Sequence, residues 1–191
     1  WVGYSPDGLA RAARYLPLIG LLVGGVGALV FWLASQVWAQ PVGVVLSMVA
    51  TSALTGAFHE DGLSDTADGL GGGWDKAKIL AVMKASRVGS CGVIAVVIAL
   101  IGKFALLSTL PAGQVVATLI AGHAVSRFCA VSLMATMAYA RDDETSKARP
   151  VAARLGAGAL LFALVFAVLP LVMFAPEQAL PAIAMAALAT T

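Results

Sequence analysis

Long apolar stretches separated by short polar segments dominate the chain. No Asp, Glu, Lys or Arg occurs between Tyr15 and Phe58, and this run is about twice the ~20 residues that a helix needs to cross a bilayer. The more polar sequence at 35–41 divides the run and predicts a helical hairpin, with Trp38 near the membrane interface. Because lipid offers no hydrogen-bond partner to the backbone, each apolar stretch is predicted to be a helix.

This pattern predicts an all-α fold, a polytopic membrane helical bundle with at least six spans. The predicted spans cover 15–35, 42–58, 91–110, 115–139, 155–174 and 178–191. Gly20, Gly24 and Gly27 would let the first span approach a neighbouring helix closely. We expect one integral-membrane domain over 1–191. We also expect it to be part of a longer polypeptide at both ends, since it opens at Trp1 and stops within an apolar run.

Composition excludes a soluble or disordered chain and makes the lipid bilayer the expected partner. The 191 residues are 60% hydrophobic and 12% charged, whereas a soluble domain is about half apolar and about a quarter charged. A mean hydropathy of +0.93 argues against disorder. The net charge of +2 does not suggest a nucleic-acid partner. Cys91 and Cys129 are too few for a disulfide framework or a thiolate metal site, so we interpret them as packing residues.

Charged residues gather on one side of the predicted topology. Ten of the 12 Lys and Arg residues, and nine of the 10 acids, precede the first span or follow the second or fourth. The positive-inside rule assigns these segments to the cytoplasm. Arg127 lies inside a span, where a charge is costly and often functional. His123 precedes it by one helical turn, so both side chains are candidates for a shared polar cavity.

An acidic cluster at the end of the second predicted span is the most informative segment. It has the sequence HEDGLSDTADG over 59–69. In a helix Asp61, Asp65 and Asp68 lie on one face, because they are four and then three residues apart. Carboxylates so close repel each other, so a cation is expected to compensate them. Oxygen ligands without thiolates favour Mg²⁺ or Mn²⁺. The alternative is a solvated acidic loop.

A glycine-rich and then basic stretch follows this cluster. Glycines at 69–73 would let backbone N–H groups approach an anion closely. Lys84 and Arg87 are candidates to hold phosphate oxygens, Arg87 with two parallel bonds. Beside a metal cluster, these features suggest transfer of a phosphorylated group. Taken alone, the glycine run is more typical of a flexible linker.

A second polar cluster lies on the same predicted side of the membrane. The sequence over 141–150 is RDDETSKARP. Arg141, Asp142 and Asp143 are candidates to bind a metal ion or a nucleotide. The segment is equally consistent with a solvated cytoplasmic loop.

Two longer motifs carry a family resemblance. GAFHEDGLSDTADGLGGGWD over 56–75 and MKASRVGSCG over 83–92 resemble the cobalamin-5′-phosphate synthase family, also called adenosylcobinamide-GDP ribazoletransferases. The similarity extends to 14–20, the Ser126-Arg127 pair and 139–143. It implies an Mg²⁺-dependent enzyme of the bacterial inner membrane that joins adenosylcobinamide-GDP to α-ribazole or its 5′-phosphate in cobalamin (vitamin B12) biosynthesis. A ribose hydroxyl would attack the phosphorus nearer the cobinamide, and GMP would leave.

The resemblance and the residue types together give each candidate a role. Asp61, Asp65 and Asp68 are expected in catalysis and, with Glu60, as ligands of one or two Mg²⁺ ions. His59 is the candidate base for the hydroxyl proton, and a metal-bound carboxylate is the alternative. The expected substrate-binding residues are Lys84, Arg87, His123, Arg127, Arg141, Asp142 and Asp143.

The sequence departs from the family pattern at two places. Members usually carry Asp where this chain has Ala85, and the family's downstream Gly-Gly-x-Thr-Gly-Asp segment is absent. The first departure puts full activity in question. The second implies that part of the site lies outside this sequence.

Two other functions are alternatives to this enzyme. The sequence does not determine whether the protein forms a homo-oligomer. A CDP-alcohol phosphotransferase also clusters aspartates at a membrane helix, but it usually follows the first Asp-Gly with Ala-Arg, where this chain has Leu63-Ser64. A cation transporter usually places its acids mid-membrane at broken helices in repeated halves, and we find no repeat.

Overall fold

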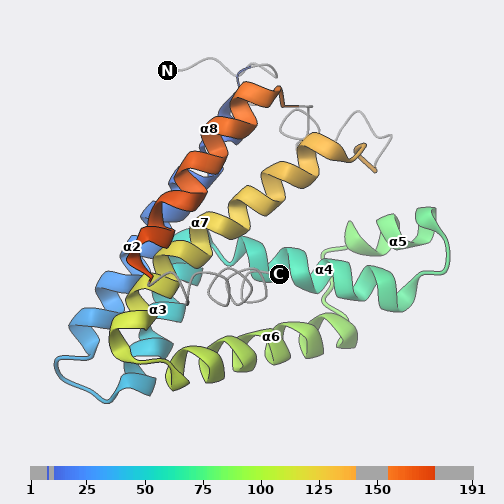
Figure 1. Cartoon of the computed structure of the whole chain (residues 1–191). Coiled ribbons are helices and arrows are strands. Elements are labelled where there is room, and N and C mark those ends of the chain that lie inside the picture. Colours follow the sequence, from blue (N-terminus) through green and yellow to red (C-terminus); the bar gives the residue numbers. More distant parts are fainter. Residues whose placement is uncertain (1–7, 9–10, 141–154, 175–191) are drawn as a thin grey trace. The chain divides into compact units, whose positions relative to one another are not determined.

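The computed structural model describes Gly8 and residues 11–140 and 155–174, and every regular element in this part of the chain is helical (Figure 1). The all-α prediction is therefore confirmed for these residues. The elements are η1 (Ala13–Tyr15), α2 (Leu16–Ala34), α3 (Gln40–Thr55), α4 (Phe58–Gly72), α5 (Lys76–Met83), α6 (Ser90–Thr109), α7 (Ala112–Thr136), α8 (Ala157–Val168) and η2 (Leu169–Met173).

The described residues hold three or four candidate membrane spans. Three helices are long and apolar enough to cross a bilayer: η1 continued by α2, then α6, and then α7. Helices α3 and α4 would supply a fourth if they form one broken span, and the apolar helix Ala157–Met173 is shorter. The sixth predicted span, 178–191, lies outside the described residues. The prediction of a membrane helical protein stands, and its count of at least six spans is not reached in this part of the chain.

The second predicted span, 42–58, ends earlier than expected. Gly56 and Ala57 both adopt the left-handed conformation, with φ of 66° and 54°. Glycine tolerates this backbone, whereas alanine loses roughly 1–2 kcal/mol there. The chain turns by 84° at this break. The acidic cluster therefore forms a helix of its own, α4, instead of extending the preceding span.

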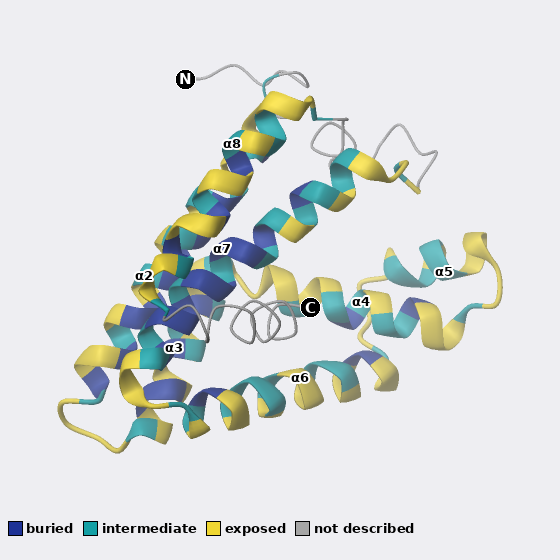
Figure 2. Ribbon diagram, in the orientation of Figure 1, coloured by how far each residue is buried: buried dark blue, intermediate teal, exposed yellow. Residues whose placement is uncertain are grey.

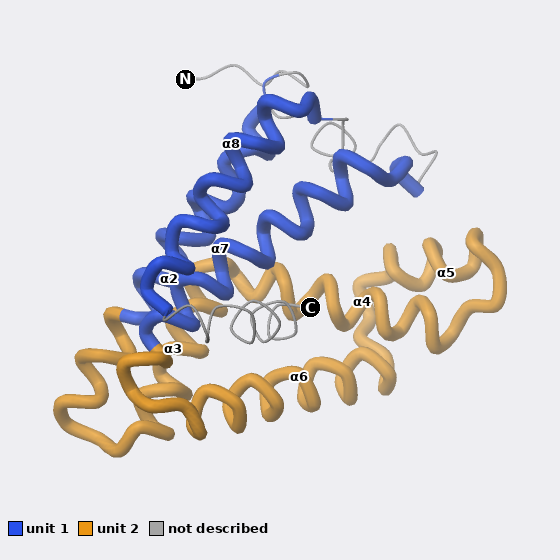
Figure 3. Tube along the Cα trace, in the orientation of Figure 1, with its two compact units in different colours: residues 1–28, 116–190 blue, residues 29–115, 191 orange. Residues whose placement is uncertain are grey.

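The chain divides into two compact units, each described by itself (Figure 3). Unit 1 comprises residues 1–28 and 116–190, and unit 2 comprises residues 29–115 with residue 191. All the acids of α4 therefore belong to unit 2. The expectation of a single domain over 1–191 stays a prediction.

Helices α2 and α7 meet backbone to backbone within unit 1. A Cβ atom on Gly20 would collide with the carbonyl group of His123, and one on Gly24 would lie 2.7 Å from the Cα atom of Ile120. The predicted close approach of the first span to a neighbour is thus confirmed for these two glycines.

A stacked contact joins η1 to α8 in the same unit. The guanidinium of Arg14 lies 4.8 Å from the ring centroid of Tyr15 and 5.6 Å from that of Phe162. The Tyr15 and Phe162 rings pack edge to face, with centroids 5.3 Å apart. Burial of aromatic surface and the cation–π contacts together hold α8 against the start of the first span.

Helix α4 packs against both α5 and α6 in unit 2 (Figure 1). Helix α6 is exposed along much of its length (Figure 2). Its large apolar residues Ile94, Ile98 and Ile101 are all more than half exposed. An apolar surface of this kind is costly in water. It is the surface that a membrane-spanning helix presents to lipid.

Candidate active site

Helix α4 carries all four predicted metal ligands in its first three turns. Asp61, Asp65 and Asp68 share one face of this helix, as their spacing predicts. Asp61 is exposed, whereas Asp65 and Asp68 are half-buried. Glu60 and Asp61 lie in the first turn, where the helix dipole stabilises negative charge.

Asp68 connects α4 to the beginning of α6. The backbone N–H of Gly89 donates to its Oδ2 atom at 2.6 Å, and that of Gly92 donates to its Oδ1 atom at 2.8 Å. Gly89 is the N-cap of α6 and has no side chain to cap it. The Asp68 carboxylate does this in its place, pairing two of the N–H groups that a helix leaves without intrahelical partners.

Gly89 and Gly92 make the approach of Asp68 sterically feasible. A Cβ atom on either glycine would collide with the Asp68 carboxylate, and one on Gly92 would also collide with Ser64 Oγ. Ser64 is buried, and its hydroxyl oxygen has no hydrogen-bond partner among the described residues. Sequence reasoning missed the roles of these three residues. The Gly-x-x-Gly spacing at the start of a predicted span was the available signal.

Glu60 spans the break between α3 and α4. Ser52 Oγ donates a hydrogen bond to its Oε1 atom at 2.7 Å. Its Oε2 atom is buried and has no hydrogen-bond partner in the part of the chain that the structure describes. Glu60 therefore joins the two helices across Gly56 and Ala57.

The four predicted metal ligands are not gathered into a cage. Across residues 11–140 and 155–174, no three His, Cys, Asp or Glu side chains are placed to hold a metal ion together. Mg²⁺, however, is usually bound by one or two carboxylates together with substrate phosphates and water. Asp61 and Asp65 lie one turn apart on α4 and fit this mode. The Asp68 carboxylate accepts two backbone hydrogen bonds, and Glu60 accepts one from Ser52. The metal assignment stays a prediction.

The predicted base lies on another face of α4. His59 is exposed and packs edge-on against Phe58, with ring centroids 5.7 Å apart. It is two residues from Asp61, and side chains two positions apart on a helix do not face each other. A carboxylate of α4 is therefore better placed than His59 to accept a proton from a substrate bound at the helix face that carries Asp61, Asp65 and Asp68.

The predicted phosphate-binding residues lie in the segment between α5 and α6. Lys84 is the C-cap of α5, and Arg87 lies two residues before Gly89. Both side chains are exposed, as is that of Ala85 between them. Since Gly89 is bonded to Asp68, this basic segment is tied at its end to the helix that carries the carboxylates.

His123 and Arg127 bind each other within unit 1. Arg127 Nη1 donates to the carbonyl oxygen of His123 at 3.0 Å and contacts its Nδ1 atom at 3.1 Å. Arg127 is buried. The structure therefore pairs these two residues one turn apart on α7. The shared polar cavity and the substrate-binding role of both residues stay predictions. Arg141, Asp142 and Asp143 lie outside the described residues.

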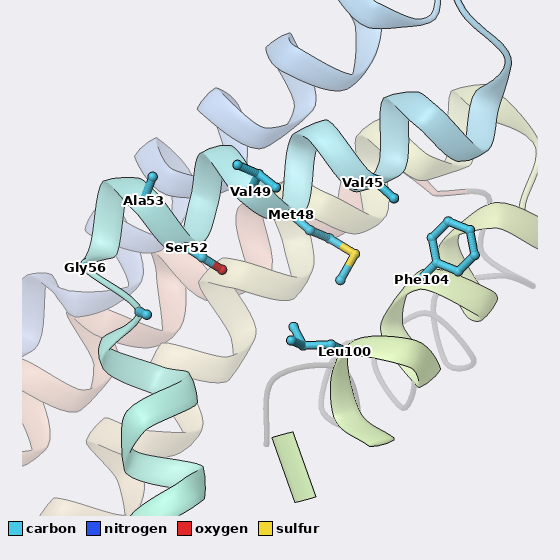
Figure 4. Close-up of a pocket in the computed structure, with 9 residues that line it drawn as sticks. Val45, Met48, Val49, Ser52, Ala53, Gly56, Leu100 and Phe104 are labelled. Carbon is cyan, nitrogen blue, oxygen red and sulfur yellow. The ribbon is translucent and has the colours of Figure 1, made fainter. Parts of the chain in front are cut away.

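An apolar pocket of about 510 Å³ opens between α3 and α6 in unit 2 (Figure 4). Met48, Leu100 and Phe104 line it, and Ser52 supplies the single hydroxyl among its lining side chains. Ser52 is also the residue that bonds Glu60. The pocket therefore reaches the same break from which α4 begins.

Comparison with known proteins identifies the family. A family model described as cobalamin-5-phosphate synthase matches residues 2–191. The chain belongs to this family. The adenosylcobinamide-GDP ribazoletransferase of Ralstonia nicotianae is 49% identical over 187 residues, which are 96% of this chain and 72% of that protein. Those of Ralstonia pickettii and Shewanella woodyi are 50% and 47% identical, covering 92% and 90% of this chain and 69% and 68% of their own lengths. No solved structure matches the chain.

The match confirms the resemblance found in the two motifs and the prediction of a transferase of cobalamin biosynthesis. It favours this class of enzyme over the CDP-alcohol phosphotransferase and the cation transporter. The motif over 56–75 covers the break, α4 and the turn that leads to α5, and the motif over 83–92 contains Gly89 and Gly92. Both cobalamin-5-phosphate synthase motifs therefore meet at the Asp68 contact.

Proposed function

We propose that this chain joins adenosylcobinamide-GDP to α-ribazole or its 5′-phosphate, forming adenosylcobalamin or its 5′-phosphate and releasing GMP. The observation that carries the proposal is the bond between Asp68 and Gly89, which ties a basic segment to the carboxylate face of α4. A pyrophosphate substrate needs carboxylates that hold a metal ion and, beside them, basic side chains that bind the phosphate oxygens.

The reaction is a displacement at phosphorus. A ribose hydroxyl oxygen forms a bond to the phosphorus nearer the cobinamide, the bond from that phosphorus to the bridging oxygen breaks, and GMP departs. Lys84 and Arg87 bind the pyrophosphate oxygens and stabilise the charge that develops on the leaving group. Asp61 or Asp65 accepts the hydroxyl proton, with His59 as the alternative base.

Mg²⁺ is the proposed cofactor, and Asp61 and Asp65 are its proposed ligands. When bound, the ion neutralises pyrophosphate charge and makes the phosphorus easier to attack. The support is chemical: Asp61 and Asp65 both offer carboxylate oxygens on this face of α4, and such oxygens suit a hard divalent ion.

The proposed site faces the cytoplasm of the bacterial inner membrane, within a protein of at least six spans. The support is the distribution of charge, since ten of the 12 basic residues fall on one predicted side. An α4 that turns away from α3 by 84° is compatible with a helix lying near that surface. A homo-oligomer is compatible with this proposal.

The experiment that tests the proposal measures GMP release by membranes that contain the protein. We expect release only when adenosylcobinamide-GDP, α-ribazole and Mg²⁺ are all present. Release of GMP without α-ribazole would indicate a hydrolase. Ion flux without GMP release would indicate a transporter, and either result would contradict the proposal.

A further inference from the structure

We infer that Asp68 is a positioning residue, whose carboxylate fixes the Lys84–Gly89 segment to α4 and leaves metal binding to the other acids of that helix. The contact itself is a feature of the structure. Only the purpose of the contact, holding Lys84 and Arg87 for pyrophosphate, rests on the proposed function. Asp68 thus differs in role from Asp61 and Asp65, although the three share one helix face.

Both oxygens of the Asp68 carboxylate are engaged by backbone donors. Oδ2 accepts a hydrogen bond from the N–H of Gly89, the N-cap residue of α6, at 2.6 Å. Oδ1 accepts one from the N–H of Gly92, in the first turn of α6, at 2.8 Å. Hydrogen bonds to an ionised acceptor are short and roughly twice as strong as neutral ones. The positive end of the α6 dipole adds to the attraction. A metal ion on Asp68 would have to compete with these bonds.

The space around the carboxylate is shaped for this contact. Gly89 and Gly92 are both positions where a Cβ atom would strike the Asp68 side chain. A Cβ atom on Gly92 would also lie 2.9 Å from the carbonyl oxygen of Ser64 on α4. Two glycines and one carboxylate therefore act as a unit that sets the distance between α4 and α6. No comparable enclosure surrounds Asp61, which is exposed.

The Asp68 contact also restrains the short segment that carries Lys84 and Arg87. Arg87 lies two residues before Gly89, and Lys84 lies at the end of α5, which itself packs on α4. The segment is thereby held by α4 at both ends. Losing the Asp68 bonds would free one end and let the two basic side chains move away from the carboxylate face.

The first test measures backbone hydrogen exchange in the intact protein in nanodiscs, without substrate. We expect the amides of 86–94 to exchange at least about tenfold faster in Asp68→Asn than in the wild type, because a charge-assisted bond is lost. Asp61→Asn is the matched control and should leave this segment unchanged, because Asp61 is exposed on the same helix face. Unchanged protection in Asp68→Asn would overturn the inference, whatever the activity of the protein.

Gly89→Ala is the second variant, used if Asp68→Asn does not fold. Gly89 has φ of −94° and ψ of 176°, a backbone that alanine adopts without strain. Its methyl group should therefore collide with the Asp68 carboxylate, and the variant should reproduce the faster exchange of 86–94. Normal protection in Gly89→Ala would contradict the enclosed contact.

The last test separates anchoring from metal binding. In Asp68→Asn, we expect the KM for adenosylcobinamide-GDP to rise about tenfold or more, and the half-saturating Mg²⁺ concentration to stay within about twofold of wild type. In Asp65→Asn, the Mg²⁺ requirement should rise instead. An equal rise in the Mg²⁺ requirement of both variants would make Asp68 a ligand and overturn the inference. Inactivity of the wild type would instead contradict the proposed function, and the exchange result would still stand.

Discussion

Asp65 occupies the middle of the carboxylate face of α4, one turn from Asp61 and one turn from Asp68. We predict that Asp65→Asn lowers the rate of GMP release by about 10² or more, because a positioned charged group is lost from the site of phosphoryl transfer. Asparagine keeps the shape of the side chain and removes one like charge, so thermal unfolding in detergent should shift little. Near-normal activity at limiting Mg²⁺ would contradict the ligand assignment.

Ala85 lies exposed between Lys84 and Arg87, in the segment that Asp68 anchors. The family resemblance implies an Asp at this position. We predict that Ala85→Asp raises the rate of GMP release or the affinity for Mg²⁺, since a carboxylate there can orient Arg87, bind metal or accept a proton. Ser86→Asp serves as the control for added charge at a neighbouring exposed position. Equal rates for wild type and Ala85→Asp across a range of Mg²⁺ concentrations would exclude position 85 from the site.

Helices α3 and α4 owe their separation to two consecutive left-handed residues. Gly56 suits its φ of 66°, whereas Ala57 is strained at 54°. We predict that Ala57→Gly raises the melting temperature, by relieving about 1 kcal/mol of backbone strain, and that Gly56→Ala lowers it by a comparable free energy. Thermal melting in one detergent compares the two variants. A stabilising Gly56→Ala would mean that the break is not formed as described.

Several helices of this protein could be predicted from the sequence alone. Apolar run lengths were sufficient to predict the helices of 13–34, 90–109 and 112–136, because a membrane leaves no other regular structure for them. The one-face spacing of Asp61, Asp65 and Asp68 was equally predictable, since it depends only on helical periodicity. The end of α3 could not be predicted, because a Gly-Ala pair in a sequence does not reveal that both residues adopt a positive φ.

Partners of individual carboxylates were beyond sequence reasoning. Glu60 adjoins the Asp residues in sequence, yet its side chain bonds Ser52 on another helix. Asp68 looks like its neighbours by spacing, yet it bonds backbone groups of α6 that lie more than twenty residues away along the chain. Such assignments depend on how α4 packs against α3 and α6, which periodicity does not determine.

The orientation of the protein in the membrane is a property of the whole molecule. Trp74, in the turn between α4 and α5, is fully exposed, and Val37, in the uncharged turn between α2 and α3, is largely exposed. We predict that a cysteine replacing Trp74 is labelled only from the cytoplasmic side and one replacing Val37 only from the periplasmic side. The background variant must lack Cys91 and Cys129, since both are exposed free thiols. Labelling of Trp74→Cys from the periplasm would reverse the topology.

We propose that this member of the cobalamin-5-phosphate synthase family transfers its substrate's phosphoryl-cobinamide group to a ribose hydroxyl. The most direct measurement follows both products from the purified protein in lipid, with adenosylcobinamide-GDP, α-ribazole and Mg²⁺ supplied. We predict equal amounts of GMP and adenosylcobalamin at every time point, and neither product when α-ribazole is omitted. GMP formed without an equal amount of adenosylcobalamin would contradict the account.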